Sequence, residues 1–167
     1  MGELGRSIAR LECEDLLADL TRAYADEWFA HYNFHFVAQA LRGYRSPSLL
    51  EFVRRRSAEA LRRASRLGAR IAELGGQLPP TLAELVDRAS DKPFKLPTSL
   101  GDVDGVLRAV LDAERTSLRT YDALHRKTVD RDALTAALAV RFLAAAVRNE
   151  ETIERLIGES APAMDGR

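Results

Sequence analysis

The sequence of 167 residues has a single cysteine, no excess of either charge and no long apolar run. One cysteine, Cys13, excludes an internal disulfide framework and any metal site built from several cysteines. Lysine and arginine together number 25, as do aspartate and glutamate, so the formal net charge is zero. A nucleic-acid binder needs a basic excess to neutralise phosphates, so this balance argues against a nucleic-acid partner.

Apolar segments long enough to cross a bilayer are also missing. The longest apolar stretch, 133–147, is interrupted by Thr135 and Arg141 and falls short of the about 20 residues that a spanning helix needs. Acidic residues occupy the N-terminal region, where a secretory signal would carry its apolar stretch. We therefore expect no membrane partner and a cytoplasmic protein.

The sequence shows no sustained strand alternation, whereas the helical period recurs in four long stretches. These lie at about 14–42, 48–74, 102–127 and 130–159. A proline-rich connection, with one short helical piece at about 81–89, separates the second stretch from the third. The pattern predicts an all-α fold, an antiparallel four-helix bundle with one long crossover between its second and third helices. We expect one domain over 1–167, with the bundle at about 14–158.

Two glutamates lie in the middle of apolar helical stripes. Glu27 falls between Tyr24 and Phe34, and Glu114 falls between Val110 and Leu118. Carboxylates are rarely buried unless they are paired or bound to a metal. Either both glutamates lie at the edge of their stripes and reach solvent, or they share an internal site. Their matching places near the middle of two helices favour the shared site.

Three segments carry a resemblance to a known family. The stretch ADEWFAHYNFHFVAQALRG and the helix end ARIAELGGQLP resemble the ferritin-like superfamily, particularly its bacterioferritin-like and Dps-like members. The segment ERTSLRTY at 114–121 is similar to the family's third-helix glutamate, which a tyrosine follows seven residues later. The resemblance covers about 14–158. It implies a di-iron centre held by one Glu from each of two helices and a Glu-x-x-His pair from each of the other two.

Most of the implied iron ligands are replaced. The resemblance implies Glu27 and Glu114 as the retained ligand positions of the first and third helices. The positions of the two Glu-x-x-His pairs hold other residues, namely Ala60, Arg63, Asn149 and Thr152. Four of the six ligands, including both histidines, are therefore missing. We expect no catalytic residue and no resident cofactor, with iron as the alternative.

A remodelled metal site stays open as an alternative. His31 lies one helical turn after Glu27, so the two share a helix face and could act together with Glu114. Tyr121, seven residues after Glu114, is the other residue of this remodelled site. The competing interpretation is that His31 is hydrogen-bonded within the core and binds no metal.

Arg63 stands where the family has a ligand histidine. Two carboxylates about 6 Å apart repel by ~3 kcal/mol at an effective dielectric constant near 20, a repulsion that iron cancels in a metal-binding relative. We expect Arg63 to replace the metal's charge within salt-bridge distance of Glu27 or Glu114, aided by Asn149 and Thr152 as neutral hydrogen-bonding groups. Alternatively Arg63 reaches solvent, and one glutamate is protonated instead.

Two sets of residues, one charged and one aromatic, are expected at the surface of the bundle. The second helix carries many further arginines, which we expect on a salt-bridged outer or subunit-facing surface: Arg54, Arg55, Arg56, Arg62, Arg66 and Arg70. The same surfaces are expected for Glu59, Glu150 and Glu151, which lie off the internal stripes. An apolar outer face on the first helix predicts a homodimer, with a cage as the larger alternative, through Trp28, Phe29, Tyr32 and Phe36.

The ligand count decides between two functions. It favours a ferritin-like protein with an eroded di-iron centre, acting without catalysis as an oligomeric scaffold, shell subunit or binding module. The alternative is an iron-binding ferroxidase, iron-storage or Dps-like protein that uses a remodelled or intersubunit metal site. Dioxygen chemistry at two irons requires both irons to be held, and two carboxylates without histidine hold them poorly.

Overall fold

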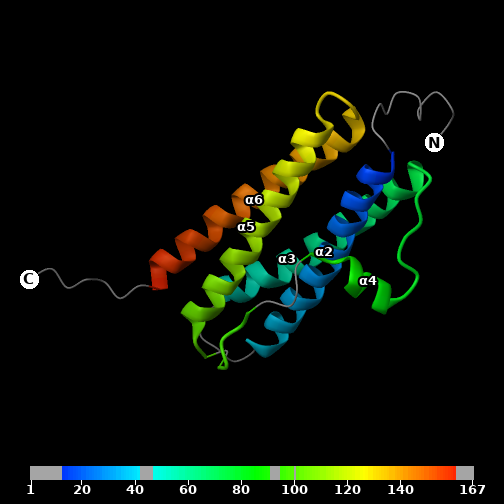
Figure 1. Cartoon of the computed structure of the whole chain (residues 1–167). Helices are drawn as coiled ribbons and strands as arrows, with labels where there is room; N and C mark the ends of the chain where they lie inside the picture. The colour runs from blue at the N-terminus through cyan, green and yellow to red at the C-terminus, as the bar shows by residue number, and fades with distance from the viewer. Residues whose placement is uncertain (1–12, 42–46, 91–94, 100, 161–167) are drawn as a thin grey trace, which may run out of the picture.

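The computed structural model describes residues 13–41, 47–90, 95–99 and 101–160, and within these ranges the chain is helical with no strand. Its long helices are α2 (Cys13–Ala40), α3 (Pro47–Glu73), α5 (Val103–Thr128) and α6 (Ala133–Ser160), and α4 (Leu82–Arg88) is short (Figure 1). The predicted all-α fold is confirmed. No helix of the described ranges is both long and apolar enough to span a bilayer.

The four long helices form two hairpins. Helix α2 packs along α3, and α5 packs along α6. Helix α4 lies between α3 and α5 in the sequence and packs beside α2 (Figure 1). Helix α4 is capped by Thr81, whose side chain accepts a hydrogen bond from the backbone N–H of Glu84. This is the predicted bundle with its long crossover between the second and third long helices.

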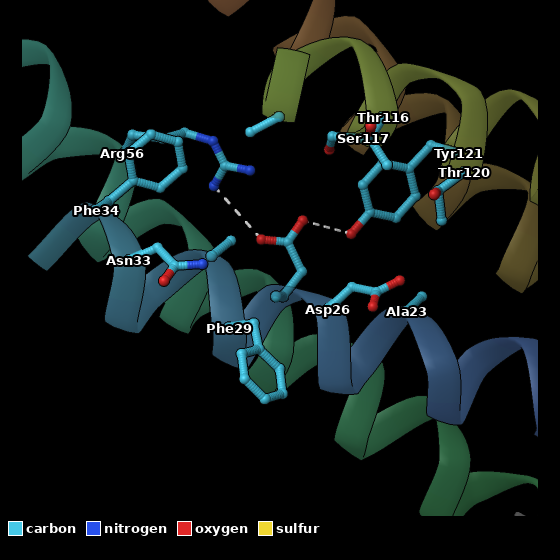
Figure 2. Close-up of a pocket in the computed structure, with 13 residues that line it drawn as sticks. Ala23, Asp26, Phe29, Asn33, Phe34, Arg56, Thr116, Ser117, Thr120 and Tyr121 are labelled. Carbon is cyan, nitrogen blue, oxygen red and sulfur yellow. Dashed lines mark hydrogen bonds and ion pairs between the residues drawn. The ribbon is translucent and has the colours of Figure 1, made fainter. Parts of the chain in front are cut away.

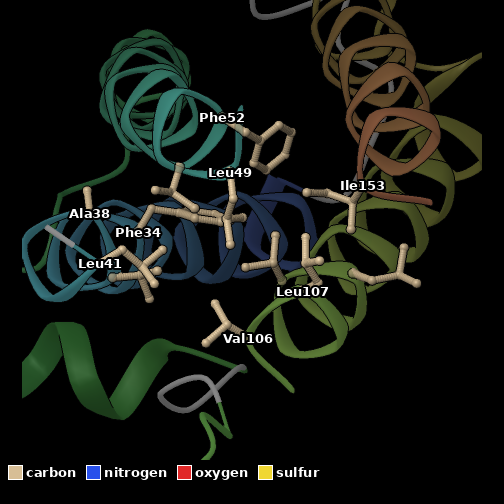
Figure 3. Packing of buried hydrophobic residues seen from close by; sticks show 12 residues of the cluster. Phe34, Ala38, Leu41, Leu49, Phe52, Val106, Leu107 and Ile153 are labelled. Carbon is tan, nitrogen blue, oxygen red and sulfur yellow. The ribbon is translucent and has the colours of Figure 1, made fainter. Parts of the chain in front are cut away.

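Two apolar clusters fill the two halves of the bundle. One gathers residues from all four long helices, among them Phe34, Leu41, Leu49, Phe52, Leu107 and Ile153 (Figure 3). The other lies nearer the opposite end and includes Leu16, Leu20, Leu67, Ile71, Leu124 and Phe142. The sequence segments that separate these clusters, such as 54–66 of α3 and 112–120 of α5, carry buried charges, among them Arg56, Arg63 and Glu114.

A buried ion pair ties the start of α6 to α3. Arg70 was expected on an outer surface, but it is buried, and its Nη2 donates to both carboxylate oxygens of Asp132 at 2.9 and 2.8 Å. Its Nε donates to Thr135 Oγ1 at 2.9 Å. Asp132 also accepts the backbone N–H of Thr135. The prediction for Arg70 was wrong because its acidic partner lies just before another helix, α6, where the local pattern of α3 does not reveal it.

Asp132 gives the fold an expected acid sensitivity. Burial raises the pKa of Asp132, but hydrogen bonds from Thr135 and Arg70 outweigh burial and hold this pKa below its ordinary value of 3.8. A carboxyl group with a lowered pKa contributes stability above its unfolded-state pKa and loses it as pH falls through the folded-state value. We expect the free energy of unfolding to decrease below about pH 4. Denaturant unfolding from pH 3 to 7 should show a flatter acid dependence for Asp132→Asn, whereas the exposed control Asp130→Asn should match the native protein.

Candidate functional site

A layer of buried charge lies between the two apolar clusters. Glu27 of α2 is 3% exposed and Glu114 of α5 is fully buried, so neither reaches solvent at the edge of its stripe. Arg56 and Arg63 of α3 are each 2% exposed. Seven residues are close to two helical turns, so both arginines leave α3 on the same side and enter the layer together.

Arg56 bridges the two glutamates. Its Nε donates to Glu114 Oε1 at 2.5 Å, and its Nη1 donates to Glu27 Oε2 at 3.4 Å. The guanidinium carbon lies 5.2 Å from the ring centroid of Phe34, within range of a cation–π contact. The expectation that Arg56 lies on an outer surface was therefore wrong. Its position four residues before the buried Ala60 is the sequence signal that places it inside.

Arg63 forms the predicted ion pair with Glu27. Its Nη1 lies 3.3 Å from Glu27 Oε1, and its Nη2 donates to Glu59 Oε1 at 2.5 Å. The guanidinium carbon lies 5.6 and 5.5 Å from the ring centroids of Tyr121 and Phe142. Glu59 was expected on a surface, yet its side chain is only 20% exposed. Its length lets the carboxylate reach the network although its Cα lies off the internal stripe.

Two neutral groups complete the network. The hydroxyl of Tyr121 donates to Glu27 Oε1 at 2.6 Å, and Arg56 and Tyr121 lie on opposite sides of a small pocket of about 50 Å³ between α2 and α5 (Figure 2). Asn149 Nδ2 lies 3.3 Å from Glu114 Oε2 and 3.3 Å from Glu59 Oε2. Asn149 is therefore a neutral side chain that donates hydrogen bonds to the carboxylates, as the sequence predicted for it.

The remaining predicted residues lie elsewhere. Thr152 was expected to assist Arg63, but its Oγ1 donates to the backbone oxygen of Arg148 at 2.7 Å, and the next residue, Ile153, is the fully buried one. His31 Nδ1 lies 3.0 Å from both the hydroxyl and the backbone oxygen of Ser57. Of the two residues assigned to a remodelled site, the structure thus brings Tyr121 to Glu27 and hydrogen-bonds His31 to Ser57.

The network joins three carboxylates to two guanidiniums. Burial alone would lower the pKa of Arg56, but the charges of Glu114, Glu27 and Glu59 raise it above its ordinary value, so Arg56 is permanently charged. Burial raises the pKa of Glu114, and the opposing charges of Arg56 and Arg63 do not cancel that effect. Glu114 is therefore a carboxyl group that holds a proton to a higher pH than an exposed glutamate does.

Burial and the neighbouring charges also set the protonation states of Tyr121 and Glu59. Burial raises the pKa of Tyr121 well above its ordinary value, and the charge of Glu27 adds to the effect. Tyr121 therefore stays protonated and acts as a hydrogen-bond donor. Burial favours the neutral form of Glu59, but the charges of Arg63 and Arg56 outweigh it and lower the pKa of this carboxyl. Glu59 is consequently ionised and pairs with Arg63.

The donor set of this layer does not fit a pair of irons. A di-iron centre of this architecture takes four carboxylates and two imidazoles. Within the described ranges, no three His, Cys, Asp or Glu side chains are grouped so that they could hold a metal ion. Guanidinium nitrogens of Arg56 and Arg63 contact both oxygens of Glu27 and one oxygen of Glu114, so an entering cation would meet two fixed positive charges.

The chain is similar to known proteins in both sequence and fold. The family model described as a ferritin-like domain matches residues 17–161. A "DNA protection during starvation protein" of Pyrococcus furiosus is 28% identical over 147 residues, which is 88% of this chain and 79% of that protein. The dodecameric thioferritin of Bacteroides fragilis has a TM-score of 0.88 at 21% identity, covering 96% of this chain and 95% of that one. Dps from Thermosynechococcus elongatus has a TM-score of 0.79 at 14% identity, covering 98% and 100%.

Proposed function

The chain belongs to the ferritin-like domain family, and on that basis we propose that an internal ion-pair network has replaced its di-iron centre. The protein would then act without catalysis, as an oligomeric scaffold or shell subunit. The observation that carries this proposal is the position of Arg56, which bonds both Glu27 and Glu114 in the middle of the bundle. These two glutamates stand where the family resemblance implies retained iron ligands.

Charge balance explains how such a replacement is stable. Loss of metal alone would leave two buried carboxylates to repel one another in a poorly solvated layer. A guanidinium is always charged and presents several N–H groups in one plane, so it can neutralise two carboxylates at once. Arg63, at the position of a family histidine, supplies the second positive charge through its pair with Glu27.

Oxidation of Fe(II) tests the absence of catalysis. We expect the native protein to leave the rate of Fe(II) oxidation by dioxygen or peroxide equal to the rate without protein. The double variant Glu27→Gln with Glu114→Gln should behave in the same way, since the native centre contributes no oxidase activity. If the native protein oxidised Fe(II) well above the background rate, and the double variant lost this activity, the centre would be an iron site.

Assembly is the second part of the proposal. In the single chain two large aromatic side chains one helical turn apart on α2 are open to solvent, Tyr32 at 66% and Phe36 at 47%. Adjacent exposed aromatics of this size are typical of a partner surface. The Bacteroides fragilis relative is described as dodecameric, which supports a homo-oligomer for this chain and favours a cage over a plain dimer.

Charge substitution tests this surface. The variant Tyr32→Arg with Phe36→Arg should shift the mass measured by light scattering towards the 18.5 kDa monomer, because a symmetric interface would bring the new charges together. A control with equal added charge, Val140→Arg with Val147→Arg on α6, should keep the native mass, since both positions are exposed away from α2. A monomeric native protein at micromolar concentration would contradict the proposed oligomer.

Iron chemistry between subunits is a second candidate function. It is favoured by the Dps-like resemblance of the sequence and by the imidazole rings of His31 and His35, whose centroids lie 6.2 Å apart on α2. A site of this kind would need residues from two copies of the chain. Under this alternative, the monomeric variant Tyr32→Arg with Phe36→Arg would lose an oxidation activity that Glu27→Gln with Glu114→Gln retains.

A further inference from the structure

A second concentration of charge lies in the groove between α3 and α6. An open pocket of about 240 Å³ occurs there. Its charged lining residues are five arginines and one acid, namely Arg62, Arg63, Arg66, Arg141, Arg148 and Glu59. The chain as a whole has no net charge, so this groove concentrates positive charge that acids elsewhere balance.

Helical spacing brings the arginines of the two helices together. Arg62 and Arg66 are four residues apart on α3, and Arg141 and Arg148 are seven apart on α6, so each pair lies on one face of its helix. All four are exposed. Like charges held this close repel one another and raise the free energy of the unliganded protein.

Among the described residues, these four arginines lack the carboxylate partners that Arg115 and Arg126 have. The exposed side chain of Arg115 bonds Glu150 at 2.8 Å, and Arg126 lies 3.0 Å from Asp122. Within the described part of the chain, no ion pair joins a carboxylate to any of the four groove arginines. Their positive charge is therefore available to an anion from solution.

The inner wall of the pocket offers a further donor. Arg63 lines the pocket while being almost completely buried, and its two terminal nitrogens are engaged with Glu27, Ser117 and Glu59. Its Nε, which is also buried, has no hydrogen-bond partner among the described residues. A buried donor of a charged group is costly to leave unpaired, so a rearrangement of the Arg63 side chain that turns this atom towards a ligand in the pocket would be favoured.

We propose that the groove between α3 and α6 is a binding site for a short chain of phosphate groups, either inorganic or the phosphate tail of a nucleotide. Guanidinium forks match the geometry of phosphate oxygens and bind them with paired hydrogen bonds. The pocket is smaller than the roughly 300–1,000 Å³ of sites for drug-sized ligands, so it suits a few phosphate groups and not a large organic molecule. The zero net charge of the chain argues against an extended nucleic-acid surface.

Calorimetric titration of the native oligomer with sodium tripolyphosphate tests the site. The titration should show saturable binding at constant ionic strength, which keeps general screening equal in all samples. The variant Arg66→Gln with Arg148→Gln should weaken binding by about tenfold or more, since it removes two charged donors. Its control is Arg54→Gln with Arg108→Gln, which removes the same charge from exposed positions outside the pocket and should change affinity by less than about twofold.

Two further measurements make the outcome decisive. Without ligand, the pocket variant should unfold at the same or a higher temperature than the native protein, because it relieves repulsion, and this confirms that it folds. Binding of ATP more tightly than tripolyphosphate, lost in the same variant, would identify a nucleotide tail as the source of the phosphates. The proposal fails if millimolar tripolyphosphate shows no saturable binding, or if the pocket and control variants lose affinity equally. It also fails if duplex DNA binds more tightly and displaces tripolyphosphate.

Discussion

Replacing Arg56 by methionine should lower the free energy of unfolding by about 3–5 kcal/mol, the cost of breaking a buried ion pair by removing one partner. The loss is expected to be this large because Arg56 bonds two carboxylates, Glu27 and Glu114, which are both almost fully buried. Denaturant unfolding at neutral pH measures it. The neighbouring substitution Arg54→Met is the matched control and should change stability by less than about 0.5 kcal/mol, because Arg54 is exposed.

A compensating variant separates electrostatics from packing. Adding Glu27→Gln and Glu114→Gln to Arg56→Met removes the two carboxylates that lose Arg56 as a partner, and replacing several members of a buried ion network is often far milder than removing one. We expect the triple variant to recover most of the stability that the single change loses. A triple variant as unstable as Arg56→Met alone would show that Arg56 acts through the volume it fills and not through its charge.

Restoration of the missing ligands should create iron binding. The fourfold variant contains Ala60→Glu, Arg63→His, Asn149→Glu and Thr152→His. Because Arg56 still bonds Glu27 and Glu114 in that variant, we expect substantial iron uptake only when Arg56→Leu is added. The fivefold variant should then approach about two irons per chain, the stoichiometry of the family's four-Glu, two-His centre.

The geometry also predicts unequal affinities in the restored centre. Thr152 is partly exposed and Ile153 is buried. The side chain of a histidine at position 152 would therefore point less directly into the bundle than that of a histidine at position 63. We therefore expect the second iron to bind more weakly than the first. Protein-bound iron is counted after anaerobic loading and desalting. Adding Glu27→Gln and Glu114→Gln is the control and should return uptake to the native level, and a fivefold variant that binds no more iron than the native chain would contradict the account.

The fold was predictable because each long helix carries its own pattern. Apolar spacing marked the four long helices, and the prolines between 75 and 101 marked the crossover. The ion pair of Arg63 with Glu27 was predictable because two carboxylates on internal stripes require a cation, and the family resemblance placed Arg63 at the position of a ligand histidine. These inferences depend on a residue's position along its own helix, which the sequence states directly.

The errors arose where local patterns are ambiguous. Arg56 ends a run of three arginines, and composition alone does not separate it from exposed Arg54 and Arg55. Only its place one turn before Ala60 distinguishes it. Residues of α6 up to position 147 are nearly all apolar, so that helix has no sharply defined inner face, and the error at Thr152 was a shift of one position. Pairs between helices, such as Arg70 with Asp132, are visible only in three dimensions.

We propose that guanidinium charge, and not iron, neutralises Glu27 and Glu114. The decisive experiment is anaerobic titration of the native protein with Fe(II), followed by desalting and measurement of bound iron. We expect well under one tightly bound iron per chain, with no change in the variant Glu27→Gln with Glu114→Gln. Retention of about two irons per chain by the native protein, lost in that variant, would contradict it.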